Sequence, residues 1–274
     1  QKTGGSPEQL PLLQDSDPSI NNSTSQMTSE EKVGNAKKLT QLKDLLPADI
    51  SDEGAVILEP AAGGVHTALK AKIQSGDVVV VQGSGTMGLC SIAAIRELTN
   101  AETIIASAKY PLQKTLAEEF GADIVVGPSE LKRAVRQVTG CRMIGNSLSG
   151  GSNVTIDAVG NASSIKTSLD ITRPRGRVVM LGMPGVTKVD LTPLWHREIE
   201  MVGSYTYGTE ELSNGETTSS YELAFDLVRE KKLEKLVTDT YPLDRYQDAI
   251  RHAADAGSLG SVKVVFDMRN EKRR

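Results

Sequence analysis

Cysteine and long apolar runs are both scarce in this sequence of 274 residues. Its two cysteines, Cys90 and Cys141, are too few for a disulfide framework or for the four-thiolate cage of a structural zinc. Any metal would have to use other ligands. No stretch reaches the eighteen or so apolar residues that a membrane span needs, and the N-terminus lacks the residue order of a signal peptide. We therefore expect a cytoplasmic protein with no membrane partner.

Aromatic residues and an excess of positive charge are also lacking. Only 4% of the residues are aromatic, and the first of them is Tyr110, so the first third of the chain is short of large core side chains. The formal net charge of −4 would not attract a nucleic acid or an anionic membrane. The composition, 38% hydrophobic and 24% charged, is that of an ordinary folded chain, and its partners are expected to be small molecules.

The chain divides into three expected parts. Residues 1–44 form a disordered lead-in, because at least the first 35 mix Gly, Pro, Ser, Asn and charge with little apolar periodicity. Residues 45–240 form a dinucleotide-binding domain, and residues 241–274 form a closing helix-strand segment with a charged tail. Around residues 51–70, apolar spacing after a Ser51 start signal predicts one or two helices.

Short apolar runs then alternate with longer amphipathic ones, which predicts an α/β fold with a doubly wound parallel sheet, the Rossmann fold. The expected strands are residues 78–82, 103–107, 124–126, 154–158, 177–181, 200–204 and 262–267. The expected helices are residues 87–98, 111–120, 130–138, 163–170, 221–229 and 246–256. Residues 139–152 and 208–220, rich in Gly, Ser and Thr, are interpreted as loops.

The most informative motif is a glycine-rich turn between the first expected strand and helix. Residues 83–88, Gly83, Ser84, Gly85, Thr86, Met87 and Gly88, follow four valines and a glutamine and read G-x-G-x-x-G. Gly83 would make the tight turn, Gly85 would let a pyrophosphate approach the backbone, and Gly88 would let the helix pack closely. The backbone N–H groups at the helix start would face the phosphates. A ligand-free strand-turn-helix corner and a methyltransferase-type loop are the alternatives.

The end of the second expected strand bears on the choice of dinucleotide. An NAD site usually has an acidic residue there to hold the ribose hydroxyls. This sequence has Ala108 and Lys109 instead, so no carboxylate repels a 2′-phosphate and a cation lies beside the site. The charge favours NADP over NAD, although Lys109 could also be an ordinary solvated lysine in a site that binds NAD.

These motifs, in this order, resemble the cofactor domain of the zinc-type, medium-chain alcohol dehydrogenase superfamily. The resemblance covers roughly residues 43–267 and includes LEPAAGGVHTAL, SGDVVVVQGSGTMGL, AEEFGADIVV, VTIDAVGN, RPRGRVVMLGMPG and IEMVGSYTYG. It implies nicotinamide contacts from Gly182, Met183, Ser204 and Tyr205, and contacts near the dinucleotide from Asp157 and Gly160. In the polyol and threonine dehydrogenase branch, Glu59 of the L-E-P triplet would bind or adjoin zinc, or it is a plain helix carboxylate.

The sequence departs from that family before residue 45. Family members begin with a barrel-like domain that carries Cys and His zinc ligands, whereas residues 1–44 contain neither residue type. We therefore expect that the catalytic domain is missing, that its closing segment remains at the C-terminus, and that zinc is doubtful. His66 is expected to be structural, and His196 and His252 to be surface or packing residues.

The resemblance implies an oxidoreductase that transfers hydride between NADP or NAD and a secondary alcohol, a polyol or a carbonyl. The alternatives are a non-catalytic NAD(P)-binding module and a zinc-independent quinone-type reductase. By analogy with family dimers, a homo-oligomer is expected through the edge strand at residues 200–207.

Overall fold

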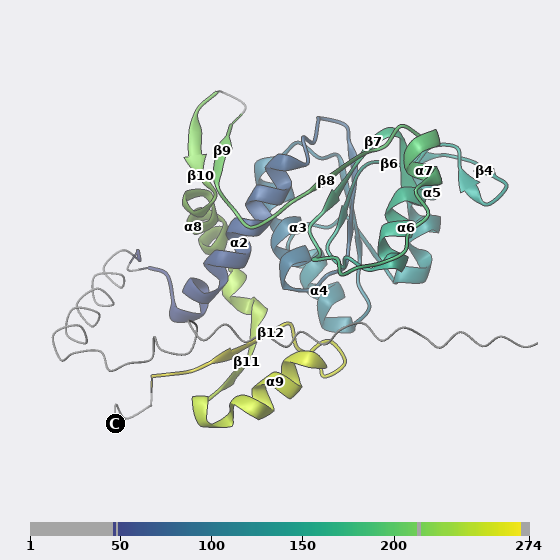
Figure 1. The fold of residues 1–274 in the computed structure, drawn as a ribbon. Coiled ribbons are helices and arrows are strands. Elements are labelled where there is room, and N and C mark those ends of the chain that lie inside the picture. The colour runs from purple at the N-terminus through teal and green to yellow at the C-terminus, as the bar shows by residue number, and fades with distance from the viewer. Residues whose placement is uncertain (1–45, 48, 213–214, 270–274) are drawn as a thin grey trace, which may run out of the picture. The chain divides into compact units, whose positions relative to one another are not determined.

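A central parallel sheet forms from the strand-helix alternation, with helices on both of its faces (Figure 1). The computed structural model describes residues 46–47, 49–212 and 215–269. The six strands lie in the order β3-β2-β1-β6-β7-β8, and every neighbouring pair is parallel. This order confirms the predicted doubly wound fold. The predicted lead-in over residues 1–44 lies outside the described residues.

The elements of the first half follow the predicted ranges closely. They are α2 (Asp52–Lys70), β1 (Val78–Gln82), α3 (Thr86–Leu98), β2 (Thr103–Ser107), α4 (Pro111–Glu119), β3 (Ile124–Val126) and α5 (Leu131–Thr139). The other three strands of the sheet and the helices between them are β6 (Ser152–Asp157), α6 (Ala162–Ile171), β7 (Thr172–Met180), α7 (Thr192–His196) and β8 (Glu200–Gly203). No helix among the described residues is long and apolar enough to cross a membrane.

The rest of the chain follows the sheet. It comprises β9 (Thr209–Glu211), β10 (Thr217–Ser219), α8 (Ser220–Lys231), β11 (Val237–Tyr241), α9 (Tyr246–Ala254) and β12 (Lys263–Phe266). Strands β11 and β12 form a separate parallel pair. The expected strand at residues 262–267 therefore exists but is not part of the main sheet, and its partner β11 was not predicted.

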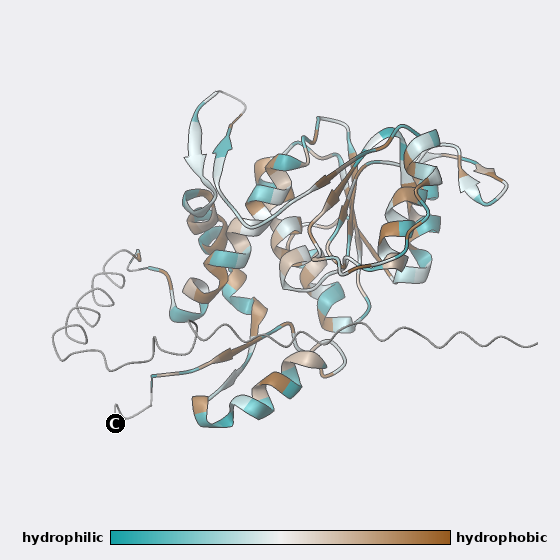
Figure 2. Ribbon diagram, viewed as in Figure 1, coloured by the Kyte–Doolittle hydropathy of each residue, from teal (hydrophilic) through white to brown (hydrophobic). Residues whose placement is uncertain are grey.

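The core is divided by the pleat of the sheet, because successive strand side chains point to opposite faces. Val79 and Val81 of β1 join the large cluster with α2 and α3, whereas Val80 packs with Leu131 and Val135 of α5. All three valines are fully buried. Figure 2 shows the same division as brown strands between helices whose outer faces are teal.

Helix α2 is a single helix, and its start matches the predicted signal. The hydroxyl of Ser51 accepts a hydrogen bond from the Gly54 backbone N–H at 3.0 Å, which satisfies one of the free donors at the helix start. Further along, α2 packs on α3 at very short range. A Cβ at Gly64 would lie 2.7 Å from the carbonyl carbon of Cys90, whereas one at Gly63 would collide with the terminal methyl of Met87 and lie in ordinary contact, at 3.6 Å, with the Thr206 carbonyl oxygen.

These two neighbouring glycines predict responses of different size to the same substitution. Alanine in a helix is ordinarily favoured over glycine by roughly 1 kcal/mol, and Gly63→Ala should keep the free energy of unfolding within about that amount because the Met87 side chain can move. Gly64→Ala should lower it by about 1–3 kcal/mol, because the new methyl group meets backbone. Urea unfolding of both variants measures the difference, and equal stabilities would contradict the packing described here.

Both segments interpreted as loops contain short antiparallel hairpins, which corrects that interpretation. β4 (Met143–Ile144) pairs with β5 (Ser147–Leu148), and β9 pairs with β10. The first hairpin is held from a distance by the buried side chain of Arg197, whose guanidinium donates to the carbonyls of Leu148, Gly150 and Thr172 at 2.6–2.8 Å. Because Arg197 lies about fifty residues further on, local sequence could not show this support.

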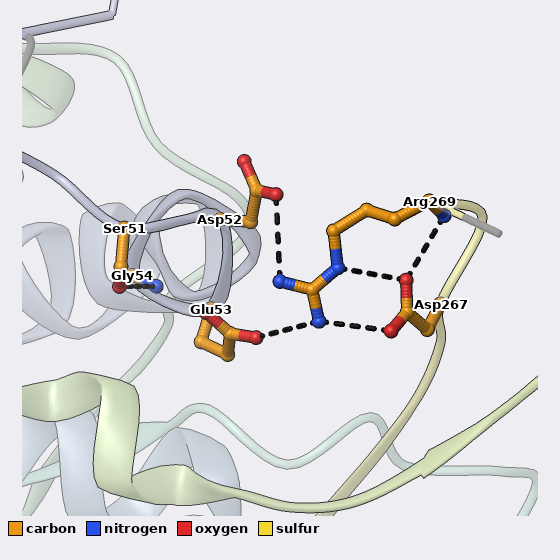
Figure 3. Close-up of polar contacts among 6 residues, drawn as sticks. All are labelled: Ser51, Asp52, Glu53, Gly54, Asp267 and Arg269. Carbon is orange, nitrogen blue, oxygen red and sulfur yellow. Dashed lines mark hydrogen bonds and ion pairs between the residues drawn. The ribbon is translucent and has the colours of Figure 1, made fainter.

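The end of the C-terminal strand is tied to the start of α2 by Arg269 (Figure 3). Its guanidinium binds both carboxylate oxygens of Asp267 at 2.8–2.9 Å and Glu53 at 3.1 Å, and it lies 3.7 Å from Asp52. The hydrogen bonds from Arg269 lower the pKa of Asp267 from its ordinary 3.8 to about 2. The arginine thus connects two segments that are more than two hundred residues apart.

The pairing with Arg269 sets a pH range that can be measured. Because the pKa of Asp267 is lowered by folding, its contribution to stability is complete above pH 3.8 and is lost as the pH falls through about 2. In Arg269→Ala the midpoint of Asp267 should rise toward 3.8 in an NMR titration of the carboxyl carbons. The pKa of Asp248, lowered by Arg245 and Arg251, serves as the internal reference. An Asp267 midpoint that stays near 2 in the variant would show that a group other than the Arg269 side chain lowers the pKa of Asp267.

Candidate cofactor site

The turn between β1 and α3 gives each glycine of the motif the surroundings that the pattern predicts. Gly83 has φ +97°, and a Cβ there would lie 2.6 Å from the Val159 side chain. Gly88 lies so close to the carbonyl oxygen of Gly83 that any side chain would collide with it. Gly85, the N-cap of α3, has nothing within 4 Å of a Cβ position. Two glycines are therefore required by the fold, and the space at the third is open.

A cleft of about 600 Å³ opens beside this turn, at the carboxyl edge of the sheet. This is the edge at which doubly wound sheets bind ligands. The cleft is lined by Gln82, Gly83, Ser84, Gly85, Ser107, Lys109, Tyr110, Gln113, Pro128, Ser129, Ala158, Val159, Asn161, Ser163, Ser164 and Thr167. Four of the predicted cofactor residues, Gly83, Ser84, Gly85 and Lys109, thus lie on its wall.

The N-terminus of α3 adjoins the cleft. The first helical hydrogen bond runs from the Leu89 N–H to the Gly85 carbonyl at 2.9 Å, so the N–H groups of Thr86, Met87 and Gly88 have no partner within the helix. Such a helix start carries a partial positive charge and free donors. The geometry is suited to an anionic group placed over Gly85.

The end of β2 supplies the charge of the cleft. Ala108 is buried, and its N–H donates to the Val126 carbonyl at 3.0 Å. Lys109 is exposed, with its ammonium 5.2 Å from the centroid of the Tyr110 ring. Among the described residues that line the cleft, Lys109 is the one charged side chain, and no carboxylate faces it. The cleft is therefore electropositive at this end.

Asp157 has a structural task in this fold. It is fully buried at the end of β6, and its carboxylate accepts from the backbone N–H groups of Val159 and Gly160 at 2.9 and 3.0 Å and from the Ser164 hydroxyl at 2.8 Å. Both carboxylate oxygens are engaged in shaping the turn into α6. Asp157 is thus placed to position the cleft wall, and it is not among the residues that line the cleft.

The predicted nicotinamide residues lie beyond the cleft wall. Gly160, with φ +75°, allows close contact with Gly182, where a Cβ would lie 2.5 Å from the Gly160 nitrogen. Met183 and Tyr205 are 92% and 85% exposed. Ser204 is buried, and its hydroxyl hydrogen bonds to that of Thr67 on α2 at 2.9 Å. None of the four predicted nicotinamide residues, Gly182, Met183, Ser204 and Tyr205, lines this cleft.

The described residues do not form a metal site. Glu59 is exposed on α2, and no group of three or more His, Cys, Asp or Glu side chains among the described residues could hold a metal ion. His66 pairs with a buried carboxylate, because its Nδ1 lies 2.8 Å from Glu210. The same carboxylate accepts a hydrogen bond from the Ser220 hydroxyl at 2.5 Å. The expectation that His66 is structural agrees with this network.

The other two histidines also have local tasks. His196 is exposed at the end of α7, with its Nδ1 2.8 Å from the Thr192 carbonyl oxygen. His252 of α9 lies between the hydroxyls of Tyr241 and Ser261, at 2.8 and 2.7 Å. Neither histidine lines the cleft.

Several functional candidates escaped the sequence reasoning. Tyr110, Gln113 and Asn161 line the cleft. The C-terminal segment also reaches the glycine turn, because the Thr86 hydroxyl donates to the Val262 carbonyl at 3.4 Å. No local signal marked this contact, since the two residues are 176 positions apart.

Taken together, the sheet order, the glycine turn and the cleft define a cofactor-binding domain of the Rossmann class. Residues 86–219 match the family model described as zinc-binding dehydrogenase. The chain is 28% identical over 219 residues to a sorbitol dehydrogenase of Bacillus subtilis (strain 168), a match that covers 76% of this chain and 56% of the relative.

Solved structures agree. The L-idonate 5-dehydrogenase of Escherichia coli K-12 has a TM-score of 0.63 at 25% identity, over 80% of this chain and 58% of that one. A proposed zinc-binding dehydrogenase of Sinorhizobium meliloti 1021, solved bound to NADP, has a TM-score of 0.63 at 26% identity, over 81% of this chain and 61% of that one.

Residues 86–219 thus match the zinc-binding dehydrogenase family, and the relatives and the fold support the cofactor-binding domain of the zinc-type, medium-chain alcohol dehydrogenase superfamily. The chain spans less than two thirds of the length of each of these relatives.

Proposed function

We propose that this protein is an oxidoreductase that binds a nicotinamide dinucleotide in the cleft at the carboxyl edge of the sheet. The observation that carries the proposal is the open space over Gly85 at the N-terminus of α3, beside a cleft of about 600 Å³. A pyrophosphate there would accept hydrogen bonds from the N–H groups of Met87 and Gly88. The adenosine half would extend toward Ser107 and Lys109 at the end of β2.

NADP is the preferred dinucleotide in this proposal. Lys109 is the one charge on the described cleft wall, and the site has no carboxylate to repel a 2′-phosphate. Ser107, also on the wall, would add a hydroxyl donor, whereas the Ser84 hydroxyl already donates to the Ser107 carbonyl at 3.1 Å. Relatives support a dinucleotide of this kind, since the Sinorhizobium meliloti protein was solved bound to NADP.

The bound nicotinamide would supply the hydride chemistry, as cofactors of this class do. The residues of this chain would bind and orient it: the α3 N-terminus holds the phosphates, and the Gly160–Gly182 contact brings two backbone segments together at the strand ends. The described residues do not fit a catalytic zinc, because no group of three or more His, Cys, Asp or Glu side chains forms around Glu59.

The substrate class follows from the relatives and is part of the proposal. The sorbitol and L-idonate dehydrogenases support a polyol or another secondary alcohol, with the corresponding carbonyl as product. A zinc-independent quinone-type reductase would use the same cofactor cleft. A second candidate is an NAD(P)-binding module without turnover, which the lone, exposed Glu59 favours. Turnover with sorbitol and NADP separates that module from an alcohol-oxidising enzyme.

Calorimetric titration of the 274-residue protein with NADPH and NADH tests the cofactor site. We expect micromolar binding of NADPH and at least tenfold weaker binding of NADH, a gap of about 1.4 kcal/mol. Lys109→Ala should remove most of that gap by weakening NADPH alone, because NADH lacks the 2′-phosphate.

Two further variants make this titration decisive. Lys114→Ala removes a neighbouring cation that does not line the cleft, and it should leave both affinities unchanged. Gly85→Val should fold normally, because the space there is open, yet bind neither dinucleotide. If the unmodified protein binds neither, the cofactor proposal is wrong; if Lys109→Ala weakens both equally, only the assigned preference is wrong.

We also propose a homo-oligomer formed through β8, the edge strand of the main sheet. Its outer edge is free of other described strands, and its neighbours Trp195 and Tyr205 are 80% and 85% exposed. Unpaired edge strands are templates for pairing between chains.

Sedimentation velocity across a hundredfold concentration range should show a dimer, and Met201→Pro, which removes an N–H that faces away from β7 on the outer edge of β8, should weaken it at least tenfold. Val125→Pro at the opposite edge strand β3 is the matched control and should leave dimerisation intact. A monomer at all concentrations would overturn the proposal.

A further inference from the structure

Tyr110 occupies a boundary between two parts of the fold. It follows β2, caps the start of α4 and lines the cleft. It is partly buried, and the Lys109 ammonium lies 5.2 Å from its ring centroid. An aromatic ring in this place can form an apolar wall for a flat ligand group, and aromatic faces pack well against such groups.

The other side of the Tyr110 ring rests on the C-terminal segment. Gly257, in the turn after α9, lies so close to the ring edge that a Cβ at this position would collide with it. The constraint at position 257 is steric, since Gly257 is not in the left-handed region of backbone conformation. A side chain there would have to displace the Tyr110 ring.

The turn that carries Gly257 is stiff. Its backbone closes on itself through hydrogen bonds from Leu259 N–H to the Asp255 carbonyl at 3.2 Å and from Ser261 N–H to the Ala256 carbonyl at 2.8 Å. The buried hydroxyl of Ser261 is also held by His252 at 2.7 Å. A ring pressed against this turn cannot displace it easily.

The same segment meets the phosphate turn as well. The Thr86 hydroxyl, at the start of α3, donates to the carbonyl of Val262 at 3.4 Å. Residues 257–262 therefore contact two elements of the cofactor cleft, the end of β2 and the N-terminus of α3. In Figure 1 the loop between α9 and β12 runs toward the lower end of α4, in agreement with these contacts.

We propose that the turn at Gly257 sets the position of the Tyr110 ring, and that Tyr110 is a specificity-determining wall for the adenosine half of the dinucleotide. This inference rests on the proposed dinucleotide site and adds to it a role for a segment outside the Rossmann sheet. The ligand class is an adenosine diphosphate carrying a ribose, with or without a 2′-phosphate. Gly257 acts on the ligand through Tyr110 and is a positioning residue.

Calorimetric titration of the full chain with ADP-ribose tests this directly, because ADP-ribose has the adenosine and pyrophosphate but no nicotinamide. Gly257→Ala should weaken its binding about tenfold, and Tyr110→Ala should weaken it to a similar extent, whereas Tyr110→Phe should bind as the unmodified protein does. The double variant Gly257→Ala with Tyr110→Ala should match Tyr110→Ala alone, since the glycine has no ring left to displace. Gly208→Ala, at a glycine with no atom near a Cβ position, is the matched control.

The outcomes separate this inference from the function on which it rests. If the unmodified protein does not bind ADP-ribose, both fail. If it binds but Gly257→Ala binds equally well, or the two losses multiply in the double variant, only the coupling through Tyr110 is wrong. Circular dichroism checks that each variant is folded. If Gly257→Ala is not, Tyr110→Ala against Tyr110→Phe decides, and equal affinities would overturn the role of the ring.

Discussion

The close approach of Gly88 to the carbonyl of Gly83 is the constraint on which the rest of this structure depends. It presses the first turn of α3 against the end of β1, and this aims the free N–H groups of the helix at the cleft. The packing of Gly64 on Cys90 then fixes α2 against α3. Both contacts require a missing side chain, because backbone atoms cannot move aside as a flexible side chain can. Small residues thus set the backbone spacing in a core that has few aromatic side chains.

The charge of the cleft depends on which ionisable side chains line it and which are buried in hydrogen bonds to other parts of the fold. The carboxylate of Asp157, at the carboxyl edge, accepts hydrogen bonds from two backbone N–H groups and the Ser164 hydroxyl. Glu210 is buried with His66 and Ser220. Lys109 is the one charge on the described cleft wall, which is the basis for expecting a phosphate-bearing ligand rather than one that needs a carboxylate partner.

Much of the fold could be predicted from the sequence because its signals are local. The expected strands 78–82, 103–107 and 124–126 coincide with β1, β2 and β3, since apolar runs of this length between turn residues are typical of buried parallel strands. The two hairpins and β11 were missed. Residues 139–152 carry turn chemistry throughout, and their hairpin is supported by Arg197 from across the fold. Of the predicted site residues, Gly83, Ser84, Gly85 and Lys109 line the cleft, whereas Met183 and Tyr205 are exposed and do not line it.

The sequence by itself determined the strand-helix order, the glycine turn and the absence of an acidic residue after β2, because each depends on neighbours within about twenty positions. Only the tertiary structure decided that Asp157 shapes a turn, that His66 belongs to Glu210 at a separation of 144 residues, and that Gly257 supports Tyr110. Those roles arise where distant segments meet. A histidine or a glycine has the same local pattern whether it faces a ligand, a buried carboxylate or an aromatic ring, so the partner, and with it the role, exists only after the chain has folded.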